Sequence, residues 1–116
     1  MADPRRIEKL AVLLKEELAA VLDREIEFPE GALVTITRVH VSPDKRYATV
    51  FLSVLPNDPD PILDILNERV FDIQQILNKR VRMRPVPKIR FAADEEEERR
   101  ERVEKSLAQM KRDGKL

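Results

Sequence analysis

The sequence is short of three residue types, and each shortage excludes a class of chemistry. It has no cysteine, so disulfides, thiolate metal sites and cysteine nucleophiles are excluded. Its two glycines, Gly31 and Gly114, stand far apart, which excludes a glycine-rich phosphate-binding loop. The single histidine, His40, has no cysteine or clustered carboxylate near it in sequence, so we expect an ordinary strand residue rather than a catalytic base or metal ligand.

No other stretch of the chain predicts an enzyme or a bound cofactor. Asp58 and Asp60, in NDPDP, are a conceivable metal pair, but the prolines around them explain both as parts of a turn and a helix cap. Neither a nucleophile motif nor a zinc-ligand spacing occurs in the sequence. We therefore expect a protein without catalytic activity, cofactor or metal ion.

Long apolar runs are also missing from the sequence. The first residues, MADPRRIEKL, are charged and amphipathic, so we expect neither a signal peptide nor a membrane span. The lack of cysteine suits a reducing compartment, and we expect a cytoplasmic protein. A chain of 116 residues buries one core, and no long apolar stripe is left over, which favours a single domain that is monomeric.

The charges of the chain cancel in number but not in position. Lys and Arg total 22, and Asp and Glu also total 22. Residues 78–91, NKRVRMRPVPKIRF, nevertheless hold six cationic side chains and no acid, whereas residues 94–104 hold seven acids. Because a net charge of zero hides these two blocks, the partners of the protein have to be inferred from each block separately.

The apolar spacing predicts an α+β fold in the order helix, strand, strand, helix, strand and helical tail. The expected elements are a helix from residue 3 to about residue 26, a hairpin over 33–55, a second helix from residue 60 to a limit at Pro85, a strand over 87–93 and a charged tail. The first strand of the hairpin changes its phase, because Val34 and Ile36 fall on the opposite face from Val39 and Val41. This change predicts a bulge near Thr37.

Tyr47, Thr49 and Phe51 share one face of the second expected strand. Aromatic side chains on an open sheet can stack on RNA bases, as they do in RNA-recognition modules. The stretch RYATVFLS lacks the glycine and the second aromatic of the usual signature, so we expect these aromatics to pack in the core.

Three explanations fit the basic stretch. Nucleic-acid phosphates suit its arginines, because a guanidinium group binds phosphate in a bidentate manner. The acidic run could instead neutralise the stretch, or the cations could be solvated at a helix end. Six cations exceed what a helix end needs, since the dipole effect fades within the last turn, and this favours nucleic acid. The acidic run can also pair with arginines at four-residue spacing, as Glu95–Arg99, Glu96–Arg100 and Glu98–Arg102.

Three stretches resemble the ribosome-binding factor A family, whose bacterial members assist the assembly of the small ribosomal subunit. They are RRIEKLAVLLKEELAAVLDREI, VTITRVHVSPDKRYATVFLSVL and RVRMRPVPKIRFAAD, within about residues 5–94. The most specific part is a strand, a Ser-x-Asp turn and an Ala-x-Val strand, which contain Ser42, Asp44, Ala48 and Val50.

The resemblance implies a fold, a function and a set of binding residues. The fold is KH-like, of the type II α-β-β-α-β arrangement, with a three-stranded sheet and the helices packed on one face, over residues 1–93, followed by a charged helical tail over 94–116. The function is that of a non-enzymatic assembly factor that binds 16S ribosomal RNA of the immature small (30S) subunit or its precursor and supports 16S rRNA processing and maturation. The expected RNA-binding residues are Lys79, Arg80, Arg82, Arg84, Lys88, Arg90, Arg5, Arg6, Lys45 and Arg46.

The sequence departs from the family at one motif. Members typically kink the second helix at an Ala-x-Gly element, which aligns here with Arg69, Val70 and Phe71. Val70 continues the apolar stripe, so the helix either runs unbroken or breaks differently near Arg69. Phe71 falls off that stripe and is expected to be buried by other contacts. The Gly-x-x-Gly loop of ordinary KH domains is absent as well.

Two other functions remain open from the sequence. A protein-binding adaptor would dock a partner on the hairpin edge or the tail helix, and its cations would be incidental. Its binding would depend little on salt, whereas RNA binding weakens steeply as salt rises. A hibernation-type factor would bind mature ribosomes instead of immature particles.

Overall fold

The computed structural model describes residues 3–56 and 58–114, with the side chain of Glu98 left out. The first helix, α1 (Pro4–Glu25), begins where the sequence predicts, because the Asp3 side chain accepts a hydrogen bond from the N–H of Arg5 at 3.0 Å. Proline at the first helical position loses no hydrogen bond. The buried side chains of α1 follow the predicted spacing of three and four and are Leu10, Leu14, Leu18, Val21 and Leu22.

The strands β1 (Leu33–Val41), β2 (Tyr47–Leu55) and β3 (Lys88–Ala93) form a three-stranded sheet in the order β1-β2-β3. β1 and β2 are antiparallel, whereas β2 and β3 are parallel. The expected hairpin and final strand are thus confirmed. β2 is the central strand, in agreement with its high apolar content.

The predicted bulge in β1 is confirmed at Thr37. Ile36 pairs with Leu52 and Arg38 pairs with Phe51, so Thr37 is the extra residue between two consecutive partners on β2. Side chains alternate along a strand, and one inserted residue therefore reverses the faces beyond it. The bulge is what turns the valines at the end of β1 toward the same core as Ile36.

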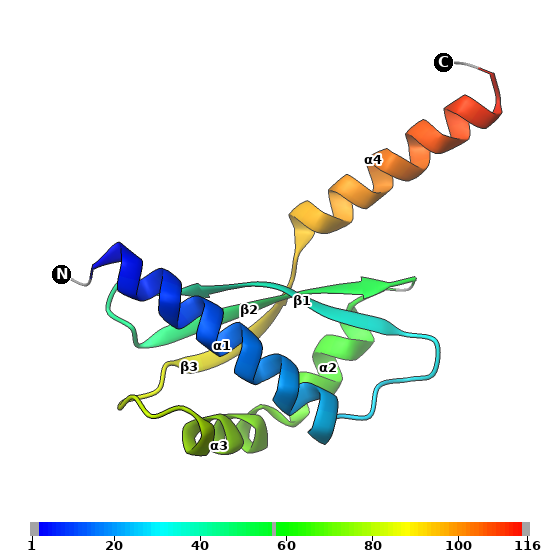
Figure 1. Cartoon of the computed structure of the whole chain (residues 1–116). Helices are drawn as coiled ribbons and strands as arrows, with labels where there is room; N and C mark the ends of the chain where they lie inside the picture. The colour runs from blue at the N-terminus through cyan, green and yellow to red at the C-terminus, as the bar shows by residue number, and fades with distance from the viewer. Residues whose placement is uncertain (1–2, 57, 115–116) are drawn as a thin grey trace.

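The second expected helix is divided into α2 (Asp60–Glu68) and α3 (Val70–Arg80). Arg69 separates them with φ −104° and ψ 5°, outside the helical region. The division occurs without the Ala-x-Gly element of the family. It allows α2 to contact β3 while α3 contacts α1, as Figure 1 shows.

The expectation that Phe71 is buried is wrong. Phe71 is 71% exposed in the first turn of α3. Val70, its neighbour, packs against the core as the apolar stripe predicts. Only one side of this turn faces the sheet, so Phe71 projects into solvent.

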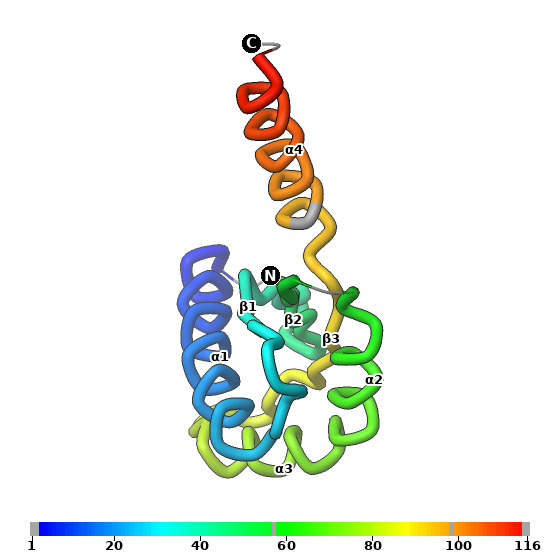
Figure 2. Tube along the Cα trace, turned by 90° about the vertical axis from the view of Figure 1, so that its right-hand side faces the viewer, coloured from blue at the N-terminus to red at the C-terminus, as the bar shows by residue number. Residues whose placement is uncertain are grey.

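The helices α1, α2 and α3 lie on one face of the sheet, and α4 (Glu95–Arg112) rises from the other side (Figure 2). The core lies between the sheet and the first three helices. Its central members are fully buried leucines and an isoleucine from both layers: Leu14, Leu18, Leu52, Leu66, Ile73 and Leu77. One face of the sheet is therefore covered, and the other is mostly not.

The helix α4 extends away from the rest of the molecule (Figure 1). The expected polar helix is present, and its apolar stripe of Val103, Leu107 and Met110 is 52%, 48% and 39% exposed. In the part of the chain that the structure describes, no helix combines the length and the apolar content that a membrane span requires.

Candidate nucleic-acid interface

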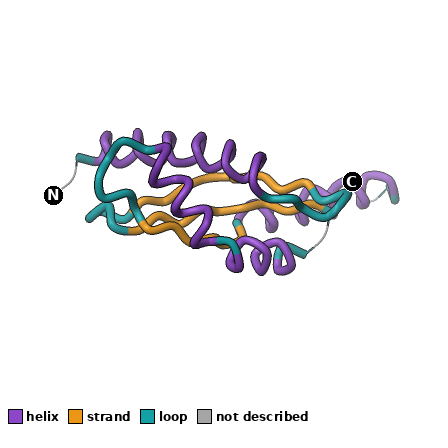
Figure 3. The backbone as a smooth tube through the Cα atoms, turned by 90° about the horizontal axis from the view of Figure 1, so that it is seen from below, coloured by secondary structure: helices purple, strands orange, loops and turns teal. Residues whose placement is uncertain are grey.

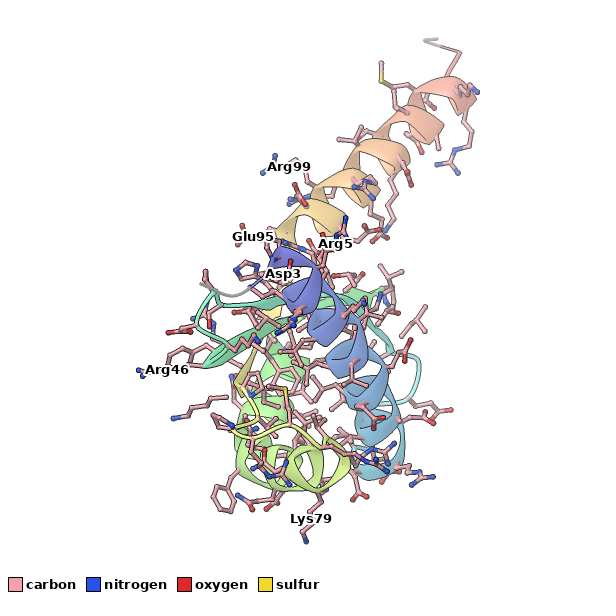
Figure 4. All side chains as sticks on the ribbon, turned by 60° about the vertical axis from the view of Figure 1, so that its left-hand side comes forward. Asp3, Arg5, Arg46, Lys79, Glu95 and Arg99 are labelled. Atoms are coloured by element: carbon pink, nitrogen blue, oxygen red, sulfur yellow. The ribbon has the colours of Figure 1, made fainter. Side chains whose placement is uncertain are left out.

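Three segments carry the cations that the sequence predicts to bind RNA, and all three lie at one end of the molecule. The start of α1, the β1–β2 turn and the segment from the last turn of α3 to the start of β3 are together at the left of Figures 1 and 3. In Figure 4 this end faces the viewer, and Arg5, Arg46 and Lys79 are labelled at three different places on it. We refer to these cations as the basic end, which comprises Arg5, Arg6, Lys45, Arg46, Lys79, Arg80, Arg82, Arg84, Lys88 and Arg90.

The last turn of α3 contributes Lys79 and Arg80 to the basic end, where cations favour the helix dipole. Arg80 Nε lies 2.6 Å from Glu17 Oε2 of α1, and the two side chains are 32% and 26% exposed. Arg80 therefore connects α3 to α1 and is partly neutralised. Lys79 and Arg82 are exposed, and among the described side chains no carboxylate pairs with either.

Arg84 stabilises the loop that follows α3. Its Nη1 donates to the carbonyl oxygens of Val81 and Met83, at 2.6 and 2.7 Å. Both carbonyl groups lie just beyond the last residue of α3, where no helical hydrogen bond is available, so this contact satisfies acceptors that would otherwise need water. The side chain of Arg84 thus has a structural role in addition to its charge.

Lys88 and Arg90 lie on β3, next to the β1–β2 turn rather than to the end of α3. The N–H of Lys88 donates to the carbonyl of Arg46 at 2.8 Å, which fixes the start of β3 beside the turn. Arg90 Nε donates to Thr49 Oγ1 at 3.0 Å. The six cations of the basic stretch therefore divide into two groups.

The β1–β2 turn holds Lys45 and Arg46 in a defined geometry. Asp44 accepts hydrogen bonds from the Ser42 hydroxyl at 2.6 Å and from the Arg46 N–H at 3.0 Å. The bond from Ser42 is the main cause that lowers the pKa of Asp44. Lys45 has φ 61°, in the left-handed region that is uncommon for a residue with a side chain. A lysine thus stands where glycine or asparagine would cost less.

The uncovered face of the sheet carries side chains that the sequence patterns placed in the core or did not single out. Tyr47 is 57% exposed, so the prediction that it packs in the core is wrong. Phe51 lies on the same face, and the guanidinium carbon of Arg38 is 3.9 Å from the centroid of its ring. Arg38 was missed because it comes opposite Phe51 only through the bulge. The polar residues Thr49 and Ser53, which share the face of Tyr47, are the signal in the sequence that could have placed Tyr47 outside.

The acidic run forms ion pairs within α4. Arg100 Nη1 lies 3.2 Å from Glu97 Oε2, at a spacing of three residues, and Lys105 pairs with Glu101 at 3.2 Å. Among the described side chains, Glu17 supplies the one carboxylate that pairs with the basic end. Of the predicted pairs, Glu95–Arg99 and Glu96–Arg100 are not formed between described side chains, and Glu98 of the pair Glu98–Arg102 has a side chain outside the described part.

The chemistry of the basic end is that of anion binding. Over residues 3–56 and 58–114, no three His, Asp or Glu side chains come together as a metal site would require. His40 is exposed on β1. Guanidinium and ammonium groups that face water without a carboxylate partner bind phosphate oxygens readily.

Comparison with known proteins gives a consistent family. The model of the family described as ribosome-binding factor A matches residues 6–107. The ribosome-binding factor A of Thermodesulfovibrio yellowstonii is 35% identical over 109 residues, which cover 93% of this chain and 92% of that protein. The one from Natranaerobius thermophilus is 40% identical over 108 residues, which cover 90% of this chain and 82% of that protein.

Solved structures share the fold. The crystal structure of ribosome-binding factor A from Thermus thermophilus aligns with a TM-score of 0.67 at 24% identity, over 75% of this chain and 94% of that one. A homology model of the Thermus thermophilus factor, fitted into an electron cryo-microscopy map of a 30S complex, aligns with a TM-score of 0.65 at 27% identity, over 74% and 92% of the two chains. The expected KH-like α+β fold is thus confirmed. Because the family match spans nearly the whole chain, this protein belongs to the ribosome-binding factor A family.

Proposed function

We propose that this protein binds the ribosomal RNA of the immature small (30S) subunit and supports 16S rRNA processing and maturation without catalysing a reaction. The observation that carries the proposal is the basic end, where cations from three separate segments face solvent and only Arg80 is paired with a described carboxylate. A family relative from Thermus thermophilus was fitted into a map of a 30S complex, which supports the choice of particle. The protein acts as a monomer in the cytoplasm, where it meets these particles.

The basic end fits RNA better than a protein partner because its charge is mostly uncompensated. Each phosphate that a cation neutralises releases condensed counterions, so the binding constant falls as salt rises. About five phosphate contacts on single-stranded RNA predict a slope of about −3.5 in a plot of log K against log salt. A protein-binding adaptor with an apolar interface would show almost no slope.

Sedimentation of the full chain with ribosomal particles tests the proposal. The protein is mixed with immature and with mature small subunits at low and at high salt, and the pellets are compared. We expect co-sedimentation with the immature particle at low salt and release at high salt. Binding that is insensitive to salt would favour the adaptor, and stronger binding to the mature particle would favour a hibernation-type factor.

Charge reversal tests whether the basic end makes the contact. Lys79→Glu with Arg82→Glu changes two cations that have no carboxylate partner among the described residues, so the fold is expected to survive. This variant should lose co-sedimentation, because two contacts become repulsive. Arg99→Glu with Lys111→Glu makes the same change of charge on α4, a helix that leads away from the basic end (Figure 1), and should sediment like the unchanged protein. Equal sedimentation of the two variants would contradict the assignment of the RNA contact to the basic end.

A further inference from the structure

The uncovered face of the sheet is a surface separate from the end of α3. Its strands β1, β2 and β3 contain no aspartate or glutamate. The side chains that define it form cross-strand rows, from the β1–β2 turn inward: Tyr47 beside Lys88, then His40, Thr49 and Arg90, then Arg38 and Phe51. We refer to these seven residues as the open face.

The open face carries three positively charged side chains, and contacts with neighbouring residues fix two of them, Arg38 and Arg90. Arg90 is fixed by its hydrogen bond to Thr49, and Lys88 is exposed beside Tyr47. Arg38 is the cation of this face with a carboxylate partner in the described structure, since its Nε lies 3.5 Å from Asp94 Oδ2. The surface therefore attracts an anion at the end nearest the β1–β2 turn.

Two flat groups on the open face are suited to stacking. The first is the ring of Tyr47, a residue that is 57% exposed. The second is the guanidinium of Arg38, which rests on the Phe51 ring at 3.9 Å and has a side chain that is 51% exposed. Nucleic-acid bases stack on aromatic rings and on arginine planes in single-stranded RNA complexes. Tyr47 and Phe51 are four strand residues apart, which separates the two stacking groups by about 13 Å.

The helix α4 leaves this part of the sheet uncovered. It approaches the sheet at the far end of β2, where Glu101 and Arg102 line a hollow with Val54 and Leu55. Tyr47 is at the opposite end of β2. The tube in Figure 2 shows α4 leading away from the sheet rather than along it.

We propose that the open face binds a single-stranded segment of RNA, with an unpaired base stacked on Tyr47 and the neighbouring phosphates held by Lys88 and Arg90. Arg38, supported by Phe51, supplies a second stacking plane. Single-stranded RNA fits because cations without acids on the strands attract a polyanion, whereas the exposed ring suits a base that is not paired. The inference rests on the proposed function only for the source of the RNA, the small subunit.

The fluorescence of Tyr47 provides a direct test, because the chain has one tyrosine and no tryptophan. The full chain is titrated with a short single-stranded RNA, with an abasic oligonucleotide of the same length and with duplex RNA. We expect quenching by the single strand and little quenching by the other two, since neither offers an unpaired base. Equal quenching by the abasic oligonucleotide would overturn the stacking contact.

Substitution separates stacking from charge. We expect Tyr47→Ala to weaken binding of a labelled single-stranded RNA by about five- to 150-fold, whereas Tyr47→Phe keeps the ring and most of the affinity. Phe71→Ala is the matched control, because Phe71 is the other strongly exposed aromatic in the described chain and lies on α3. Equal losses in Tyr47→Ala and Phe71→Ala, or no loss in either, would overturn the assignment to the open face.

The same variants distinguish failure of this inference from failure of the proposed function. If Tyr47→Ala sediments normally with immature small subunits and binds the free oligonucleotide normally, the open face is not an RNA surface, yet the function of the basic end stands. If Tyr47→Ala loses the particle but keeps the oligonucleotide, the face contacts a ribosomal protein, and the inference is wrong. Loss of both is the expected result.

Discussion

The hydroxyl of Thr37 donates a hydrogen bond to the carboxylate of Asp94 at 2.5 Å, and this contact joins the bulge of β1 to the start of α4. Asp94 also accepts from the N–H of Glu97 at 3.2 Å, so it caps α4. Its own N–H donates to the carbonyl of Leu52 at 2.8 Å. Asp94 is 4% exposed and is the one buried charged residue in the described structure. The bulge therefore has two effects. It turns the side chains of Val39 and Val41 toward the core, and it places the Thr37 hydroxyl where it binds the carboxylate of Asp94.

Stability should depend on the charge of Asp94. The hydrogen bond from Thr37 is the main cause that lowers the pKa of Asp94, and burial opposes it. The folded state thus favours the carboxylate, so its stabilising contribution is present above the unfolded pKa of about 3.9 and is lost as the pH falls through the lower folded value. Urea unfolding as a function of pH measures this contribution. We expect Asp94→Asn to lower the free energy of unfolding by about 1–3 kcal/mol at pH 7 and to reduce the loss of stability in acid.

The exposed carboxylate of Asp23 on α1 provides a control for Asp94. We expect Asp23→Asn to change the free energy of unfolding by less than about 0.5 kcal/mol. The comparison runs from about pH 6 to about pH 3, an interval that spans the usual pKa of a carboxyl group. If Asp94→Asn and the unchanged protein lose the same free energy of unfolding over this interval, the folded state does not favour the carboxylate form of Asp94.

The ion pair of Glu17 with Arg80 should stabilise the packing of α1 on α3. Its atoms are 2.6 Å apart, and both side chains are about one third exposed or less, at 26% and 32%. Solvent screens such a pair, so we expect a coupling energy of about 1 kcal/mol or less. A double-mutant cycle of Glu17→Gln and Arg80→Gln, followed by urea unfolding, measures it. Additive effects of the two substitutions would show that the pair contributes nothing to stability.

Gly31 should be sensitive to substitution through its backbone alone. It has φ 85°, and a Cβ at this position would meet nothing within 4 Å. The N–H of Ala32 donates to the carbonyl of Pro29 at 3.1 Å, which closes the turn that requires this φ. We expect Gly31→Ala to lower the free energy of unfolding by about 1–2 kcal/mol. Gly114→Ala, at φ 71° beyond the end of α4, is the control and should leave the unfolding of the core unchanged.

The sequence predicted most local features of the fold because their causes are local. Asp3 and Pro4 mark the start of α1, and alternation of apolar residues located the bulge at Thr37. The break at Arg69 was left open by the sequence, because Val70 continues the apolar stripe. Arg69 has one local and one distant contact: its Nε lies 3.4 Å from Asp72 Oδ2, and its Nη1 lies 3.5 Å from the carbonyl oxygen of Glu25, far away in the chain. The distant contact is the part that local patterns could not predict.

For the candidate site, the sequence predicted which residues carry the charge but not how they are arranged in space. The sequence shows the cations of residues 78–91 as one charge block, whereas their division into two groups follows from the pairing of β3 with β2. Arg80 and Glu17 are 63 residues apart in sequence, so their ion pair could not be predicted. Both faces of β2 are rich in apolar residues, and which face the helices cover decides that Tyr47 is exposed.

Lys45 allows the charge of the basic end to be tested without damage to the fold. It has φ 61°, which costs a residue with a side chain about 1–2 kcal/mol and costs glycine little. Lys45→Gly should therefore keep or raise the free energy of unfolding while it removes one cation. If Lys45 contacts a phosphate, the slope of log K against log salt for single-stranded RNA should become shallower by about 0.7. Lys111→Gln at the end of α4 removes the same charge and should leave the slope unchanged. An unchanged slope in Lys45→Gly would remove the β1–β2 turn from the RNA contact, because the stability measurement excludes misfolding as the cause.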